Sequence, residues 1–256
     1  MIYQFLFSAV FIWIYMSLVY VIAIKKDDLS IIDIAYGPGF VVAGVAQMLF
    51  SKGVGSHFLV IFVLIAFWAL RLALQIGIRK IGKGEDYRYT KMRKDFGSGW
   101  KWVSYYKIFL FQGLLILLIE SPLFISSLEA EKSLGILSYI GIIVWIWGFF
   151  WETVGDIQKY QFKKTGSKGI IQTGLWKYSR HPNYFGEITM WWAIFLIALE
   201  VPFGWLSIIS PILITTLLIA FSGIPLLEKK HENDPEFQQY KKKTSALIPW
   251  FSKKGE

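Results

Sequence analysis

The run FLVIFVLIAFWALRLALQIGI, residues 58–78, decides the class of fold. Arg71 is the one charged side chain in it. Because a helix needs about 20 mainly apolar residues to cross a bilayer core, this run is long enough to span a membrane. The whole chain agrees, since 55% of its residues are hydrophobic and 18% are aromatic. A membrane helix is therefore predicted here.

Six further apolar runs occupy most of the remaining chain. They lie near residues 1–24, 31–50, 105–126, 134–152, 186–200 and 204–224. The first is preceded by no basic residue and followed by Lys25 and Lys26, which is the reverse of a signal peptide. The sequence therefore predicts an all-α, polytopic membrane protein with about seven transmembrane helices, forming a single domain over residues 1–256.

Basic residues gather in the predicted loops of one side. The segments 79–104, 153–185 and 225–256 hold most of the 27 Lys and Arg, whereas the opposite loops carry only Lys52 and Lys132. Lys and Arg accumulate on the cytoplasmic side, so we expect the N-terminus outside and the C-terminus in the cytoplasm. Attraction to anionic membrane lipids, worth about 1 kcal/mol per basic residue near the surface, explains most of the tail lysines without a nucleic-acid partner.

Cysteine and histidine usage limits the possible metal sites. The chain has no cysteine, which excludes disulfides and zinc–thiolate sites. Its three histidines, His57, His181 and His231, share no helical ligand spacing. A metal centre built mainly on imidazole is therefore not expected.

Two predicted helices carry polar stripes that lead toward the cytoplasmic side. In the run 58–78 and just beyond it, the stripe consists of Trp68, Arg71, Gln75 and Arg79, at spacings of three and four. Arg71 either extends to the lipid headgroups or lines a cavity that binds an anionic group, and Gln75 between the arginines favours the cavity.

The second stripe follows the run 134–152 and consists of Glu152, Asp156, Lys159 and Lys163. A solvated helix end with intrahelical ion pairs explains Lys159 and Lys163. Glu152 and Asp156 lie nearer the membrane, where a carboxylate is costly without a partner. These two are the better candidates for a site.

The run 31–50 begins with an acidic and an aromatic candidate. Ser30 and Asp33 fit a helix capping box, which alone would account for Asp33. Residues 37–39, Gly-Pro-Gly, would break or kink this helix, as is tolerated beside a cavity. Asp33 and Tyr36 are therefore predicted to face a substrate.

The decapeptide YSRHPNYFGE, residues 178–187, lies between two apolar runs and is where we place the chemistry. Pro182 suits the first turn of a helix, so a helix N-terminus is predicted here, with its amides and dipole open to an anion. Arg180 and His181 just before it would help to bind a diphosphate or carboxylate. Glu187 fits either dipole complementation or a role in the site.

The stretch GLWKYSRHPNYFGE, residues 174–187, with Ala-Leu-Ile-Pro at 246–249, resembles the C-terminal domain of the steroid 5-alpha-reductase superfamily. The similarity is closest to its bacterial steroid-reductase-like branch and extends over the whole chain through its seven segments. Isoprenylcysteine carboxyl methyltransferases are similar too, with a related Arg-His-Pro-x-Tyr motif and an acidic, lysine-rich C-terminal stretch. The resemblance thus points to the superfamily more firmly than to the reaction.

The reductase resemblance implies hydride transfer from NADPH to an activated carbon–carbon double bond of a lipophilic, steroid- or isoprenoid-like substrate taken from the bilayer. Asn183, Glu187, Asp156 and Arg71 match polar residues of the family, and Lys163 stands where the reductases carry arginine. The predicted cofactor contacts are Arg71, Arg79, Asp156, Lys163, Arg180, His181, Asn183 and Tyr184. The predicted catalytic residues are Asp33, Tyr36 and Glu187.

The chain departs from the family in the substrate half of the site. Trp68 stands where those reductases have a tyrosine proton donor, and Lys229 and Asn233 fall near their C-terminal histidine and tyrosine. A steroid enone as substrate is thereby put in doubt. The remaining candidate donors, of which a carboxylic acid in an apolar pocket is one kind, are Tyr36, Tyr87, Tyr89, Asp33 and Glu152.

Two other classes of function stay open. One is a methyltransferase that uses S-adenosylmethionine, with the stretch from Glu228 to Glu236 closing the site, although an exposed amphipathic helix explains Glu228 equally well. The other is a transporter or a lipid-binding membrane protein.

Residues 80–99, with four glycines, are predicted to be a mobile cytoplasmic lid. The resemblance places the protein in a bacterial inner membrane.

Overall fold

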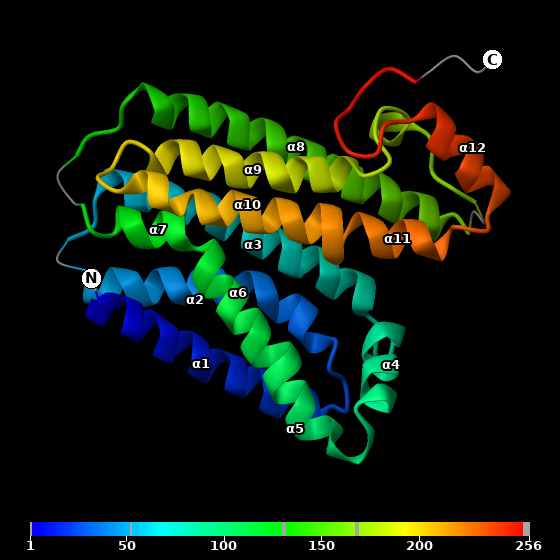
Figure 1. Ribbon diagram of the computed structural model, residues 1–256, viewed down its shortest axis with the longest axis horizontal. Coiled ribbons are helices and arrows are strands. Elements are labelled where there is room, and N and C mark those ends of the chain that lie inside the picture. The colour runs from blue at the N-terminus through cyan, green and yellow to red at the C-terminus, as the bar shows by residue number, and fades with distance from the viewer. Residues whose placement is uncertain (1, 52, 130–131, 167–168, 253–256) are drawn as a thin grey trace. The chain divides into compact units, whose positions relative to one another are not determined.

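The structure is a computed structural model that describes residues 2–51, 53–129, 132–166 and 169–252 (Figure 1). Within these residues the chain is helical and contains no strand. Ser179 and Ser245 form an isolated parallel bridge. The predicted all-α class is confirmed.

Six helical segments of the described chain are long and apolar enough to span a membrane. They are Tyr3–Lys25, Ile31–Phe50, Ser56–Lys80, Gly97–Ile119, Ile136–Lys164 and Gly204–Lys230. The protein is thus a multi-pass membrane protein, as predicted. The remaining predicted segment, near residues 186–200, corresponds to α9 (Pro182–Ala198), whose 17 residues extend only about 26 Å. This helix is shorter than the roughly 30 Å hydrocarbon core.

The chain divides into two compact units. Unit 1 comprises residues 1–135 and 198–207, and unit 2 comprises residues 136–197 and 208–256. The α-helices of unit 1 are α1 (Ile2–Lys25), α2 (Ile31–Phe50), α3 (Ser56–Lys80), α4 (Tyr87–Asp95), α5 (Trp100–Ser104), α6 (Phe111–Ile119) and α7 (Ser121–Ser126). Unit 2 contains α8 (Ile136–Lys164), nearly all of α9, α10 (Ile209–Thr216), α11 (Ile224–Lys230) and α12 (Pro235–Lys243).

Helix α2 packs against both α1 and α3 in unit 1. It continues from Ile31 to Phe50 across Gly37-Pro38-Gly39, so of the predicted break or kink the break is wrong. The glycines serve close packing instead. A Cβ atom on Gly37 would lie 2.8 Å from the backbone oxygen of Ala69, and one on Gly39 would lie 2.5 Å from Ile116 Cδ1.

The segment predicted at residues 105–126 has different bounds in the structure. A continuous run of helical turns begins at Gly97 and ends at Ile119, and α7 follows after Glu120. The Glu120 side chain is buried, and its Oε1 accepts a hydrogen bond of 3.0 Å from Nε2 of the buried Gln47. This buried carboxylate was not predicted from the sequence. A single acidic residue at the end of an apolar run carries no local signal of its distant partner.

Helices α8 and α9 run side by side in unit 2 (Figure 1) and meet along a row of small residues. The row on α8 consists of Gly141, Gly148 and Gly155, which repeat every seven residues and so share one face. A Cβ atom on Gly148 would lie 2.7 Å from the Gly186 carbonyl oxygen of α9. Small residues let membrane helices approach this closely, and here they bring α8 against the first turns of α9.

Candidate functional site

Helix α9 begins at Pro182, which confirms the helix start predicted in the decapeptide. Asn183 follows in the first turn, and its Nδ2 donates a hydrogen bond of 3.4 Å to Asp156 Oδ1 on α8. A Cβ atom on Gly155 would meet the Asn183 backbone nitrogen at 3.3 Å, so Gly155 permits this close approach. Two residues that the resemblance singled out are therefore neighbours in the structure.

In the Asn183–Asp156 pair, Asp156 is buried and Asn183 is half-buried. The Asp156 side chain is 5% exposed, and Glu152, one helical turn earlier, is 2% exposed. Asn183 Oδ1 is buried and has no hydrogen-bond partner among the residues that the structure describes. An unsatisfied buried acceptor costs about 1–3 kcal/mol. Such an atom is a site where a bound ligand with an N–H or O–H group would recover that energy.

Arg180 has a different role in the structure from the predicted anion contact. Its Nε and Nη2 donate to Glu228 Oε1 of α11 at 3.0 and 2.6 Å. Its Nη1 donates to the carbonyl oxygen of Thr244 at 2.5 Å and to that of Lys241 at 3.3 Å. The guanidinium is thus occupied in joining the decapeptide to α11 and to the end of α12. A direct contact between Arg180 and a cofactor remains a prediction.

Glu228 lies inside this cluster, so the explanation as part of an exposed amphipathic helix is wrong for it. Its side chain is 12% exposed, and its Oε2 lies 2.9 Å from Lys241 Nζ. His181 Nε2 is 3.5 Å from Glu228 Oε1. Burial lowers the pKa of the His181 imidazole, which makes a cationic ring at the α9 N-terminus less favourable than predicted.

The other predicted residues of unit 2 lie on α8 and α9. Tyr184 stacks on His181, with ring centroids 5.4 Å apart and planes at 5°. Glu187 is half-buried one turn after Asn183 on α9. Lys163 is exposed near the end of α8. Lys159 lies with its Nζ 4.9 Å from the centre of the Trp176 ring, an interaction that the solvated-helix explanation did not include.

In unit 1 the predicted stripe lies on one face of α3, beside that helix's most exposed apolar side chains. Those side chains are Phe67, Leu70, Leu74 and Ile78, each more than half exposed. Arg71 Nη1 donates to Gln75 Oε1 at 2.5 Å. The Arg71 Nε and Nη2 atoms and the Arg79 Nε atom are buried. Protein covers these atoms, and a cavity that binds an anionic group at Arg71 stays a prediction.

Asp33 belongs to a polar cluster with α4, a helix that the sequence analysis did not predict. Its Oδ1 accepts a hydrogen bond of 2.5 Å from the Tyr89 hydroxyl, and its Oδ2 lies 2.8 Å from Arg88 Nη2. Tyr89 is 5% exposed, and burial, reinforced by Asp33, raises the pKa of its phenol. The phenol therefore stays protonated at neutral pH. Tyr36, the second candidate on α2, packs edge-on against Phe40.

The capping box expected at Ser30 is absent from α2. Ser30 makes no side-chain cap. Its hydroxyl donates to Asp28 Oδ1 at 2.6 Å and accepts a hydrogen bond from Lys80 Nζ. Lys80 Nζ also lies 2.6 Å from Asp28 Oδ2. These contacts, with Glu85 Oε1 accepting from the Leu29 amide at 2.8 Å, tie residues 28–30 to the segment that was expected to be a free lid.

The contacts of Asp28 predict how the stability of this segment depends on pH. Burial acts to raise the pKa of Asp28, but hydrogen bonds from Lys80 and Ser30 outweigh it and lower the pKa below 3.8. A carboxyl with a lowered folded-state pKa stabilises the fold above its unfolded pKa and loses that contribution as the pH falls through the folded value. We therefore expect residues 26–31 to open locally below about pH 4.

Hydrogen exchange of that segment, corrected for the intrinsic rate, measures this opening between pH 6 and pH 3. The Asp28→Asn variant is the control, since its opening should depend less on pH, with only Asp27 and Glu85 left to titrate at this segment. Equal pH dependence in the variant and in the natural chain would contradict the assignment to Asp28.

Comparison with known proteins adds the family. Residues 19–244 match the model of the family described as "Protein of unknown function (DUF1295)". The chain belongs to this DUF1295 family. A relative in Schizosaccharomyces pombe, "Uncharacterized protein C594.04c", is 26% identical over 220 residues, covering 71% of this chain. The chain spans 60% of that relative's length. No solved structure matches significantly.

The DUF1295 match includes both groups of candidate residues. It extends from α1 to the first residue after α12, and so covers the Asp33 cluster of unit 1 and the Asn183–Asp156 pair of unit 2. The decapeptide and Glu228 lie within it as well. The family match therefore spans the candidate residues but assigns no reaction to them.

Proposed function

We propose that this DUF1295 protein is a membrane-embedded reductase that transfers hydride from NADPH to a carbon–carbon double bond of a lipophilic, steroid- or isoprenoid-like substrate. The observation that carries the proposal is the buried Asn183 Oδ1 beside Asp156 at the start of α9. A carbonyl oxygen and a carboxylate in one enclosed place favour a ligand with several hydrogen-bond donors. Ribose hydroxyls and a carboxamide N–H are donors of that kind.

The residues present fit one part of the cofactor better than another. Asn183 and Asp156 suit its ribose or carboxamide, and Glu187 is one turn further along α9. Its diphosphate is less well served by Arg180, whose donors already bind Glu228 and two carbonyl oxygens. Contacts from Arg71 and Arg79 to the diphosphate remain predictions from the sequence. When bound, NADPH supplies the hydride.

The second requirement of the reaction is a donor that polarises the substrate carbonyl conjugated to the double bond. Hydride adds to the far carbon of the double bond, and a proton must then reach the near carbon. The Tyr89 hydroxyl donates its one proton to Asp33 Oδ1, so it does not donate to a substrate while that bond is made. The donor remains one of the other candidates predicted from the sequence, Tyr36, Tyr87, Asp33 or Glu152.

A methyltransferase that uses S-adenosylmethionine is the second candidate, and one observation favours it. The C-terminal stretch folds onto the decapeptide through Arg180–Glu228 and through a hydrogen bond of 2.9 Å from the Arg180 amide to the Ser245 carbonyl oxygen. A closing C-terminal stretch is what that class implied.

Calorimetric titration of the detergent-purified protein with each cofactor distinguishes the two candidates. Saturable binding of NADPH without a response to S-adenosylmethionine supports the reductase and directs the search for a substrate to unsaturated bilayer lipids. The reverse result supports the methyltransferase. If neither cofactor binds to protein that melts cooperatively, both proposals are overturned. The predicted bacterial inner membrane and the cytoplasmic access of the cofactor belong to this proposal as well.

Asn183→Ala is expected to weaken NADPH binding by about tenfold, which corresponds to about 1.4 kcal/mol, the energy of one lost hydrogen bond in a buried site. The fold should survive because Asn183 is half-buried at a helix start. Asn233→Ala is the matched control, since Asn233 is exposed in the loop before α12. Titration and thermal melting of both variants test this. Equal cofactor affinity in the two would remove Asn183 from the site.

A further inference from the structure

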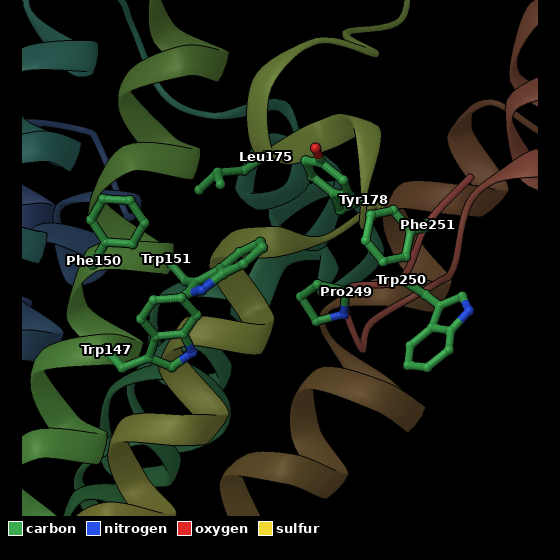
Figure 2. A pocket seen from close by; sticks show the side chains of 8 residues that line it. All are labelled: Trp147, Phe150, Trp151, Leu175, Tyr178, Pro249, Trp250 and Phe251. Atoms are coloured by element: carbon green, nitrogen blue, oxygen red, sulfur yellow. The ribbon is translucent and has the colours of Figure 1, made fainter.

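Two hollows in unit 2 share a wall made by the C-terminal segment, residues 244–252. The first is an open groove of about 400 Å³. Figure 2 shows its aromatic side chains: Trp147, Phe150 and Trp151 project from α8, and Leu175 and Tyr178 come from the loop before α9. Pro249, Trp250 and Phe251 form the opposite wall. Apart from the tyrosine hydroxyl and the indole nitrogens, the side-chain atoms that line the groove are carbon. The groove therefore suits a hydrocarbon chain.

The second hollow, of about 330 Å³, is basic. Trp250 and Phe251 belong to it as well. Its remaining lining residues are Arg180, Lys241, Lys242, Lys243, Thr244, Ser245 and Ala246. Arg180 and Lys241 are paired with Glu228. Lys242 and Lys243 are exposed and form no ion pair within the described part of the chain. Two cations are thus available to an anion there.

Trp147 and Phe150 line the groove and are themselves about half exposed on α8. Ile143, Ile146 and Ile157 on that helix are about half exposed or more, as expected of side chains that contact lipid. A bilayer lipid can therefore reach the groove sideways without leaving the membrane. The lysines lie on the predicted cytoplasmic side, where headgroups meet basic residues.

We propose that the C-terminal segment of this protein forms a binding site for one anionic phospholipid, with the headgroup phosphate in the lysine hollow and an acyl chain in the aromatic groove. The two chemistries of the hollows, joined by Trp250 and Phe251, match the two ends of one amphipathic molecule. A free phosphate would fill only the lysine hollow, and an uncharged lipid would fill only the aromatic groove. The site does not depend on the proposed reductase activity.

Occupation of this site would stabilise the decapeptide. The Trp250 amide donates to the Tyr178 carbonyl oxygen at 3.0 Å, and Ser179 Oγ donates to the Leu247 carbonyl oxygen at 2.8 Å. A lipid that binds only the folded arrangement of residues 244–252 shifts the equilibrium toward it. Anionic lipid is therefore expected to hold the α9 start in place.

Native mass spectrometry of the protein, titrated with dioleoylphosphatidylglycerol or dioleoylphosphatidylcholine, tests the headgroup half. The natural chain should retain the anionic lipid at least tenfold more strongly. The pair Lys242→Gln and Lys243→Gln should abolish that preference. The pair Lys91→Gln and Lys94→Gln is the matched control, because these exposed lysines of α4 lie on the same predicted side. Equal loss from both pairs would show diffuse attraction and overturn the proposal.

The tail half is tested with dihexanoylphosphatidylglycerol, which has the same headgroup and short chains. The natural chain should prefer the long-chain lipid. Replacing Trp250 and Phe251 by serine should remove the preference with little change in melting temperature, since these side chains are 70% and 79% exposed. Inorganic phosphate that displaces the lipid at equal concentration, or an unchanged chain preference in the serine variant, would refute the proposed site.

Discussion

Gly186→Leu is expected to leave little folded protein. A Cβ atom at this position would lie 2.4 Å from both the Glu152 amide nitrogen and the Gly148 carbonyl oxygen. Both opposing atoms are backbone, so no side chain can rotate away and α8 must separate from α9. Overpacking a core usually costs about 1–3 kcal/mol, and a leucine between two helix backbones should exceed that range. The yield of monodisperse protein in size-exclusion chromatography and its melting temperature measure the effect.

The control for this prediction is Gly77→Leu on α3. A Cβ atom on Gly77 meets nothing within 4 Å, so the same substitution there should change the melting temperature little. Gly186→Ala should already destabilise, because its one added carbon is the clashing atom. If Gly186→Leu melts like Gly77→Leu, the close contact between α8 and α9 is wrong, and the placement of Asn183 beside Asp156 loses its support.

The membrane helices could be predicted because hydropathy is a local property. Each run of about 20 apolar residues identifies itself, and Pro182 marks the α9 start in the same local way. Helix α4 was missed because its residues are polar and its stability depends on distant contacts. Arg93 Nη2 lies 2.7 Å from Glu85 Oε1, and the Arg93 guanidinium stacks 4.1 Å from the centre of the Trp100 ring.

The candidate site was predictable in its residues but only partly in its partners. The polar stripe containing Arg71 follows from helical spacing, and the structure keeps it on one face of α3. Glu228 could not be assigned to Arg180, since 48 residues separate them and each has a credible local explanation. The role of Ser30 could not be predicted either. A capping box and a hydrogen bond to Lys80 require the same residue type at that position, so the sequence does not distinguish them.

Arg180→Gln is expected to release the C-terminal segment. The change removes two hydrogen bonds to Glu228 and the contacts to the carbonyl oxygens of Lys241 and Thr244. The side chains of Arg180 and Glu228 are 8% and 12% exposed, so solvent screens the pair weakly. Breaking a buried pair by removing one partner costs about 3–5 kcal/mol. We expect faster tryptic cleavage after Lys241 to Lys243 and loss of exchange protection in residues 244–252.

Glu228→Gln is the informative companion to Arg180→Gln, because it leaves Arg180 with its two carbonyl acceptors. It should loosen the C-terminal segment less, and the double variant should cost less than the sum of the single changes, since the residues share one interaction. This comparison also distinguishes two roles of Arg180, which are contact with the cofactor and attachment of the C-terminal segment. If Arg180→Gln lowers NADPH affinity while residues 244–252 stay protected, Arg180 contacts the cofactor as the sequence predicts. If protection is lost and Glu228→Gln lowers affinity in proportion to its own loosening, Arg180 acts by holding the C-terminal segment against the decapeptide.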